Sequence, residues 1–300
     1  MARTTETTKE LSRSIFGQKI ADYQQLVKFR LNLTVVFSAS MAFAIASTGT
    51  FSWLGLAILA AGGFLITGAS NALNQVLEKD YDRIMDRTAD RPIASGRMTV
   101  SEGVMAAGLM SLMGIMLLAF FNVWAAFLGT LAMVSYAFVY TPMKRVSSIA
   151  VTLGAIPGAM PMLIGAVAYE GQLTALAWTL FGIQFFWQFA HFWAIGYLGF
   201  DQYKLAGFNF IPEENGKPHS KLGLYAMGNA LLLVPAGLVT FYLGVSGIFT
   251  VVALAVLGAV LAYFGWRLYR EPARKLALQL MFASLLYLPL ALTVLLLDKI

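Results

Sequence analysis

Four polar side chains recur at four-residue intervals around the end of an uncharged apolar run, Phe51 to Ala72. They are Asn74, Glu78, Asp82 and Asp86. Four residues advance a helix by about 400°, so these side chains are expected on one slowly turning face. Stacked carboxylates repel one another, and their oxygens are the hard ligands that Mg²⁺ prefers. The stripe therefore predicts a divalent metal site at the mouth of a membrane helix.

Arginines in the same stretch indicate what the metal would bind. Four of them follow within the polar segment, at Arg83, Arg87, Arg91 and Arg97. Guanidinium is the planar, bidentate partner of phosphate. Carboxylates for a metal and arginines for phosphate together predict a Mg²⁺–diphosphate site. The alternative is a charged loop whose residues only form a salt-bridge network at a helix end.

A second polar cluster lies in the aromatic segment 185–208. His191 falls inside an apolar span, where a polar side chain often marks a site. Structural hydrogen bonding and substrate contact, including iron ligation, both remain open for this histidine. Asp201 is a candidate ligand for a second Mg²⁺, and Tyr203 and Lys204 are candidate substrate contacts.

A third group of polar side chains marks the ends of two further spans. Tyr140, Lys144 and Arg145 close the fourth apolar span, and Lys28 and Arg30 open the first. Their positive charges are candidates for neutralising a diphosphate. Basic residues also accumulate there simply because cytoplasmic loops favour them.

The composition places these clusters in a membrane protein. The 300 residues are 59% hydrophobic and contain no cysteine, which excludes disulfides and thiolate chemistry. With a mean hydropathy of +0.71, the chain is too apolar for an ordinary soluble domain. We expect an all-α bundle of about nine transmembrane helices around a central cavity open to the cytoplasmic side. The expected spans are 29–48, 52–77, 103–121, 123–141, 147–169, 174–199, 222–243, 247–267 and 276–297.

The distribution of charge predicts the topology. All of the 21 basic residues except Lys299 fall on one side of this set of spans. The positive-inside rule then places the N-terminus in the cytoplasm and the C-terminus on the opposite side. We expect a polar cytoplasmic segment at 1–27, without a cleavable signal, and a transmembrane domain at 28–300. The basic residues are scattered among short loops, so we expect no nucleic-acid partner.

Two long polar loops, 71–102 and 200–221, lie four spans apart. This spacing predicts a pseudo-repeat that brings two polar clusters over one cavity.

The motif N-x-x-x-E-x-x-x-D, followed by R-x-x-x-R-P, resembles the UbiA superfamily of intramembrane prenyltransferases, and within it the heme O synthases. The motif residues here are Asn74, Glu78, Asp82, Arg87, Arg91 and Pro92. Segments 140–168 and 186–208 share the resemblance, which covers most of the chain in order. Two positions depart from the usual pattern: Gln202 replaces the acidic residue before Tyr203, and Ala190 replaces the proline before His191.

The resemblance implies farnesyl transfer from farnesyl diphosphate to the vinyl group of protoheme IX, with addition of water and release of diphosphate. It implies catalytic roles for the motif side chains, Mg²⁺ as cofactor, and a bacterial inner membrane as the surrounding bilayer. It leaves open whether the enzyme works alone or beside a heme A synthase or a terminal oxidase under assembly. The alternatives are a prenyltransferase for another aromatic acceptor such as a quinone precursor, a transporter, and a structural assembly subunit.

Overall fold

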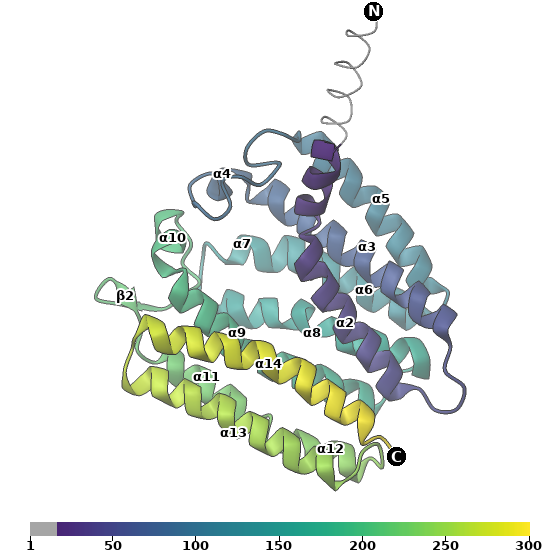
Figure 1. Ribbon diagram of the computed structural model, residues 1–300. Helices are drawn as coiled ribbons and strands as arrows, with labels where there is room; N and C mark the ends of the chain where they lie inside the picture. The colour runs from purple at the N-terminus through teal and green to yellow at the C-terminus, as the bar shows by residue number, and fades with distance from the viewer. Residues whose placement is uncertain (1–16) are drawn as a thin grey trace, which may run out of the picture.

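The computed structural model describes residues 17–300. Residues 1–16 of the predicted polar segment lie outside the described residues, and 17–26 form a helix. The elements that follow are α2 (Phe29–Ala46), α3 (Trp53–Leu77), α4 (Lys79–Asp82), α5 (Val100–Ala119), α6 (Val123–Val134), the π-helix η1 (Ser135–Tyr140), α7 (Thr141–Met143), α8 (Ile149–Glu170), α9 (Ala175–Leu198), α10 (Phe200–Leu205), β1 (Glu213–Glu214), β2 (Lys217–Pro218), α11 (Leu222–Leu231), α12 (Ala236–Tyr242), α13 (Ile248–Arg270) and α14 (Arg274–Leu297). Figure 1 shows them as a bundle of long helices.

Nine helical segments of the described chain are long enough to cross a membrane. Eight of them also have the apolar composition of a membrane span, and two of these eight are composite, Val123–Met143 and Leu222–Tyr242. The ninth is α9, whose 24 residues include no Asp, Glu, Lys or Arg but carry glutamines, aromatic residues and a histidine. The prediction of an all-α fold with about nine spans is confirmed.

Short polar side chains cap the starts of three of the long helices, α3, α5 and α9. Ser52 accepts a hydrogen bond from the backbone N–H of Gly55 and opens α3. Thr99 and Glu102 form a reciprocal capping box at the start of α5. Thr174 caps α9 by accepting from Ala177. These caps satisfy backbone donors that lipid could not satisfy, so each helix has a defined boundary.

Helix α8 lies at the centre of the bundle. It packs against α2, α6 and α9, and 67% of its most apolar window is buried inside the protein. Its sequence is rich in alanine and glycine, which lets neighbouring backbones approach closely. In a second group of helices, α11 and α14 pack onto α9, α13 packs against both of them, and α14 also reaches α2.

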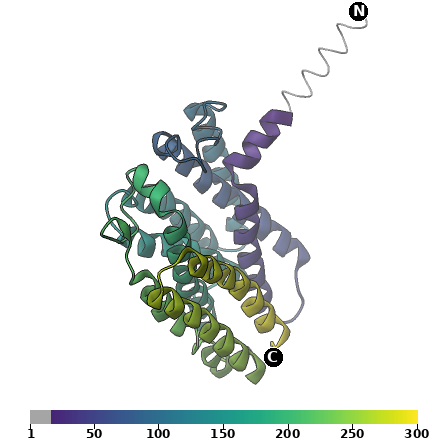
Figure 2. The same cartoon turned by 60° about the vertical axis from the view of Figure 1, so that its left-hand side comes forward.

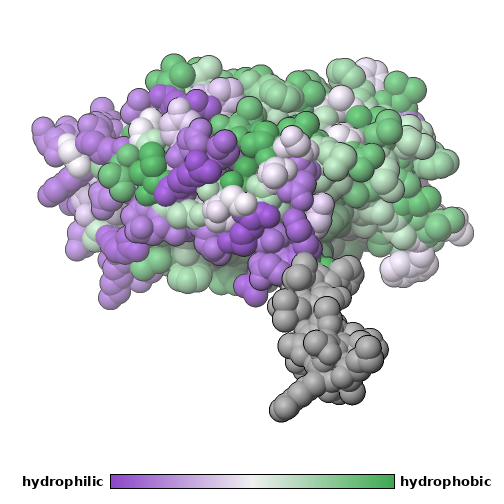
Figure 3. All heavy atoms as spheres, turned by 90° about the horizontal axis from the view of Figure 1, so that it is seen from above, coloured by the Kyte–Doolittle hydropathy of each residue, from purple (hydrophilic) through white to green (hydrophobic). Residues whose placement is uncertain are grey.

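The polar segments gather at one end of the bundle. Figures 1 and 2 both show α4 and α10 at this end and the C-terminus at the other. In Figure 3 the hydrophilic residues concentrate on the left, the same side as α4, α10 and β2 in Figure 1. Lys299 Nζ donates to the carbonyls of Ala44 and Ser47, at the opposite end of α2 from Lys28. Lys28 and the C-terminus lie at opposite ends because the chain between them crosses the bundle an odd number of times.

Candidate active site

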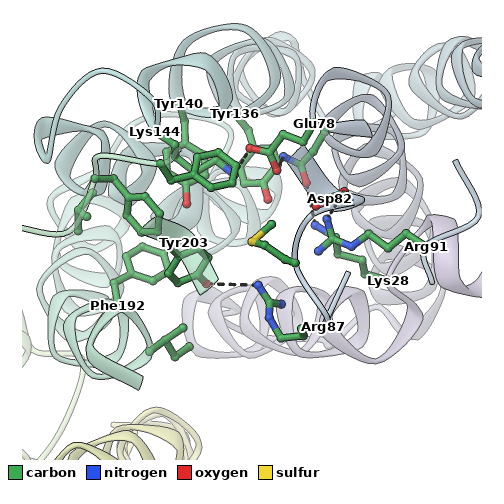
Figure 4. Close-up of a pocket in the computed structure, with 17 residues that line it drawn as sticks. Lys28, Glu78, Asp82, Arg87, Arg91, Tyr136, Tyr140, Lys144, Phe192 and Tyr203 are labelled. Carbon is green, nitrogen blue, oxygen red and sulfur yellow. Dashed lines mark hydrogen bonds and ion pairs between the residues drawn. The ribbon is translucent and has the colours of Figure 1, made fainter. Parts of the chain in front are cut away.

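A cavity of about 170 Å³ lies at the polar end of the bundle. Figure 4 shows charged side chains on one side of it and aromatic rings on another. The lining residues come from the turn before α2, the α3–α4 region and the loop after it, η1, the turn after α7, α8, α9, α10 and the loop after α10. They are Lys28, Asn74, Glu78, Asp82, Met85, Arg87, Arg91, Tyr136, Tyr140, Lys144, Val151, Phe192, Ile195, Gly196, Tyr203, Phe208 and Phe210.

The first polar cluster is built where α3 ends. The helix stops at Leu77, and Glu78 has φ −103° and ψ 7°, so the backbone turns there before the short helix α4. Asn74 Nδ2 donates to Glu78 Oε2 at 2.8 Å and to Thr141 Oγ1 at 3.2 Å. The expected single helical stripe is therefore broken after Leu77. Asn74, Glu78 and Asp82 still reach the cavity, and all three are almost fully buried.

Asp82 and Arg91 form a close ion pair inside the cavity wall. Arg91 Nη1 donates to Asp82 Oδ2 at 2.6 Å, and the Asp82 side chain is 1% exposed. Burial raises the pKa of the Asp82 carboxyl, although the neighbouring Arg91 guanidinium opposes this shift. Among the described residues, no side chain or backbone group donates to Asp82 Oδ1, which is buried. One carboxylate oxygen is thus neutralised by arginine and the other is left for a further cation.

Two lysines complete the positive side of the cavity. Lys28 Nζ donates to Asn74 Oδ1 at 3.0 Å, and Lys144 Nζ forms an ion pair with Glu78. Lys28 has φ 49°, a left-handed conformation that is uncommon for a residue with a side chain, and this turn separates helix 17–26 from α2. Burial lowers the pKa of Lys28 well below its usual value, and the charges of Arg91 and Lys144 act in the same direction.

The π-helix η1 supplies two aromatic walls. Its wider turn brings both Tyr136 and Tyr140 to the cavity, and π-helical turns of this kind are frequent at functional sites. Thr141 Oγ1 donates to the Tyr136 carbonyl at 2.9 Å and so links the π-helix to Asn74. Gly154 of α8 leaves space for the Tyr140 ring, because a Cβ at this position would come 2.6 Å from two ring carbons.

The two long polar loops meet across the cavity, as their spacing predicts. Arg87 Nη2 donates to the Tyr203 hydroxyl at 3.3 Å (Figure 4). The Gln202 amide forms two hydrogen bonds with Asp86: it accepts from the backbone N–H at 3.0 Å and donates to Oδ2 at 2.9 Å. An acidic side chain at position 202 would repel Asp86, whereas the amide joins the loops.

The structure brings part of the predicted set to the cavity and leaves the rest outside it. The predicted residues that line the cavity are Lys28, Asn74, Glu78, Asp82, Arg87, Arg91, Tyr140, Lys144 and Tyr203. Those that do not line it are Arg30, Arg83, Asp86, Arg145, His191, Asp201 and Lys204. Arg30 and Asp201 are exposed.

Other members of the outer set have protein partners. Arg83 Nε donates to the Ala94 carbonyl at 2.7 Å. Arg145 lies over the Tyr81 ring, 4.4 Å from its centroid, and donates to its hydroxyl at 3.0 Å. Lys204 pairs with Glu213 at 2.7 Å, with both side chains about half exposed.

His191 contacts α14 and is not among the residues that line the cavity. Its Nδ1 lies 2.9 Å from Ser284 Oγ, and its ring stacks on Trp187 with centroids 5.5 Å apart. Ser284 Oγ donates its single proton to the Met281 carbonyl at 2.6 Å. His191 Nδ1 must therefore be the donor to Ser284, which leaves Nε2 with a free lone pair in the neutral ring.

Several cavity residues have no polar side chain to distinguish them in the sequence. Phe192, Ile195 and Gly196 line one face of α9, and their i, i+3, i+4 spacing is the signal that could have identified them. Phe208 and Phe210 follow α10 in a loop with no periodicity, so no such signal exists for them.

Among residues 17–300, no three His, Cys, Asp or Glu side chains converge as a metal cluster. The candidate metal site therefore consists of two carboxylates and one amide.

Comparison with known proteins identifies what this chain is similar to. The sequence profile of the UbiA prenyltransferase family matches residues 35–286. The protoheme IX farnesyltransferase of Cytophaga hutchinsonii is 39% identical over 279 residues, which cover 93% of this chain and 97% of that protein. Among solved structures, a digeranylgeranylglyceryl phosphate synthase superposes with a TM-score of 0.78 at 18% identity, covering 94% of this chain and 98% of the other. A UbiA homolog from Archaeoglobus fulgidus, bound to DMAPP and Mg²⁺, superposes with a TM-score of 0.63 at 14% identity, covering 91% and 99%.

Proposed function

The chain belongs to the UbiA prenyltransferase family, and from that premise we propose that it transfers a farnesyl group from farnesyl diphosphate to protoheme IX. The choice of acceptor rests on the relative from Cytophaga hutchinsonii, which carries this activity in its name and aligns over nearly the full length. The observation that carries the reaction type is the buried cavity in which Asn74, Glu78 and Asp82 face four cationic side chains. A transporter would be expected to distribute such groups through several spans, and here they converge at one end.

The cationic side chains would bind the diphosphate group. Lys28, Arg87, Arg91 and Lys144 line the cavity together, and this concentration of positive charge favours an anion there. When the bond between C1 of the prenyl chain and the diphosphate oxygen breaks, negative charge accumulates on the leaving group. Fixed cations in a buried site stabilise that charge more strongly than water does. The family resemblance gives the catalytic roles to Arg87 and Arg91.

The oxygen ligands of the cavity fit a divalent metal. Asp82 Oδ1 is buried and accepts no hydrogen bond from the described residues, so it is available to a cation. Glu78 and Asn74 supply further carboxylate and amide oxygens, a donor set that suits Mg²⁺. The Archaeoglobus fulgidus homolog was solved with Mg²⁺ and a prenyl diphosphate. Bound here, Mg²⁺ would add positive charge next to the leaving diphosphate.

The aromatic walls would shelter the hydrocarbon part of the reaction. Tyr136, Tyr140 and Phe192 present their rings to the cavity, and ring faces stabilise nearby cations. After ionisation, the vinyl carbon of protoheme IX forms a bond to C1 of the allylic cation. Water then adds to the cation beside the porphyrin ring and loses a proton, giving the hydroxyethylfarnesyl product. The cavity of about 170 Å³ is smaller than the volume of about 300 Å³ or more that whole drug-sized ligands need. It would therefore hold only the reacting ends of the two substrates.

His191 remains the candidate contact for the porphyrin. It lies one helical turn deeper in α9 than Ile195, which lines the cavity, so it is adjacent to the reacting end without being part of it. A neutral imidazole with a free Nε2 lone pair can ligate heme iron.

We further propose a bacterial inner membrane with the polar end, including the N-terminus, in the cytoplasm, because the basic residues concentrate there. A heme A synthase or a terminal oxidase is the kind of partner that would receive the product.

The decisive experiment is product analysis with the purified protein. Incubation with heme, farnesyl diphosphate and Mg²⁺ should yield diphosphate, a proton, and a heme whose mass increases by one farnesyl group plus one hydroxyl group. A quinone precursor in place of heme should give no product. Farnesylation of the quinone precursor and not of heme would contradict the assigned acceptor. Movement of a substrate across vesicles without diphosphate release would contradict the reaction itself.

A further inference from the structure

Lys144 is held between two aromatic rings. Its ammonium lies 5.0 Å from the ring centroid of Tyr140 and 5.4 Å from that of Phe208. The same ammonium pairs with Glu78, and its side chain is only 12% exposed. A single cation of the cavity is therefore surrounded by one ring from the π-helix, one ring from the loop after α10, and one carboxylate.

This arrangement reduces the conformational entropy that a lysine side chain loses when it binds an anion. The ammonium sits on a flexible four-carbon stem and would lose much conformational freedom on binding an anion. Aromatic faces attract a cation through their quadrupole without neutralising its charge. The rings that confine this lysine leave its charge balanced by Glu78 alone, and its position is set before an anionic ligand arrives.

The backbone fixes Phe208 next to Lys144. The N–H of Asn209 donates to the Lys144 carbonyl at 2.9 Å, and the Asn209 side chain donates to the Arg145 carbonyl at 3.0 Å. Two segments 64 residues apart are thereby held in register. The Phe208 ring is 6% exposed and packs against Tyr81, with centroids 5.5 Å apart. The ring is thus immobilised from both sides.

We propose that Phe208 is a positioning residue, which holds the Lys144 ammonium in place to receive the diphosphate of the prenyl substrate. The proposal rests on the proposed function, because it assumes that the cavity binds a prenyl diphosphate. It assigns a role to a side chain that carries no polar group. Phe208 acts on the substrate through Lys144 and does not take part in the chemical steps.

A second cation of the cavity is held by α10, the helix that precedes this loop. The Arg87 guanidinium lies 5.8 Å from the Tyr203 ring centroid and also donates to its hydroxyl. Tyr203 and Phe208 pack edge to face, with centroids 6.2 Å apart. Two adjoining rings, one from α10 and one from the loop after it, therefore each support a different cation of the cavity.

The test uses the full chain in detergent and three variants. Phe208→Leu removes the ring and keeps most of its volume, and Phe208→Tyr keeps the ring. Phe200→Leu is the matched control, because Phe200 lies 5.8 Å from the ammonium of Lys204, which does not line the cavity. We expect Phe208→Leu to weaken binding of inorganic diphosphate about tenfold, as loss of a partly buried cation–π contact implies. Phe208→Tyr and Phe200→Leu should bind as the wild type does, and KM for farnesyl diphosphate should rise in Phe208→Leu more than kcat falls.

A double-mutant cycle separates positioning from packing. In a Lys144→Met background, Phe208→Leu should weaken diphosphate binding no further, because the cation that it positions is gone. Additive effects, an unchanged affinity in Phe208→Leu, or an equal loss in Phe200→Leu would each overturn the proposal. Wild-type protein that binds diphosphate but farnesylates no heme contradicts the proposed function alone. Wild-type protein that binds no diphosphate contradicts both.

Discussion

The two carboxylate oxygens of the buried Asp82 side chain have different surroundings. One of its oxygens accepts from Arg91, and the other has no donor among the described residues. Asp201 has the same functional group but is exposed and does not line the cavity. Only burial beside other oxygen ligands makes a carboxylate a candidate for metal binding. The two aspartates therefore form a matched pair for experiment.

We predict that Asp82→Asn lowers turnover about a hundredfold or more, because charge stabilisation at the leaving group depends on this cluster. Glu78→Gln should behave in the same way, and both variants should remain folded and inserted in the membrane. Diphosphate release measured against Asp201→Asn provides the control, for which we expect near-normal turnover. Equal losses in Asp82→Asn and Asp201→Asn would refute the assignment of the metal site.

A second prediction concerns the tautomer of His191. Since Ser284 gives its proton to the Met281 carbonyl, Nδ1–H of His191 donates to Ser284 and Nε2 keeps its lone pair. His191→Ala should shift the Soret band of the heme-loaded protein if Nε2 ligates iron. Ser284→Ala removes the acceptor that selects this tautomer, so it should produce a smaller shift in the same direction. A spectrum unchanged in His191→Ala would eliminate iron ligation by this residue.

At the scale of single elements, the π-helix η1 and helix α8 position the aromatic wall together. The wide turn of η1 directs Tyr136 and Tyr140 to the cavity, and Gly154 provides the space for the second ring. Small residues in α8 thus serve the site as well as helix packing. The break in the helix after Leu77 has a similar effect, because Glu78 reaches the cavity from the turn and Asp82 reaches it from α4.

Gly154→Ala tests this contact between elements. The added methyl would overlap the Tyr140 ring, and overpacking of this kind costs about 1–3 kcal/mol of unfolding free energy. Gly108→Ala in α5 is the matched control, because a Cβ there meets nothing within 4 Å and alanine is the better helix former. Thermal unfolding in detergent should separate the two variants. Equal midpoints would show that the Tyr140 ring can move freely.

At the scale of the whole molecule, the two ends of the bundle have different tasks. The polar end carries the cavity, and the opposite end holds the C-terminus against the start of α13. Asp298 Oδ2 accepts from the backbone N–H of Thr250 at 2.7 Å and from its hydroxyl at 2.8 Å. Asp298 therefore caps α13 from outside that helix and anchors α14 to it.

Asp298→Ala should accordingly affect stability and leave substrate binding unchanged. Loss of a helix cap lowers the unfolding free energy by about 1 kcal/mol, which thermal unfolding in detergent can detect. KM for farnesyl diphosphate should stay at the wild-type value, because the cap lies at the far end of the bundle. Asp298→Asn keeps an acceptor oxygen and should retain more stability. A large change in KM would indicate that the two ends are coupled.

The spans, the polar end and the first motif could all be predicted from the amino-acid sequence. Spans are readable because a segment must be apolar over its whole length to cross lipid, and this is a local property. The only span with weaker hydropathy, α9, is the one that carries His191 and the cavity residue Phe192. The motif was readable because Asn74, Glu78 and Asp82 stand out as charged or polar groups next to an apolar run.

Only the tertiary structure decided which of several equivalent side chains face the cavity. Lys144 lines the cavity and its neighbour Arg145 does not, and the same holds for Lys28 and Arg30. These pairs have the same charge and nearly the same position in the chain. The two members of each pair differ in the direction of their side chains, which is set by packing against segments dozens of residues away. The positioning role proposed for Phe208 could not be predicted from the sequence for the same reason, because its contact with Lys144 forms only after two distant loops come together.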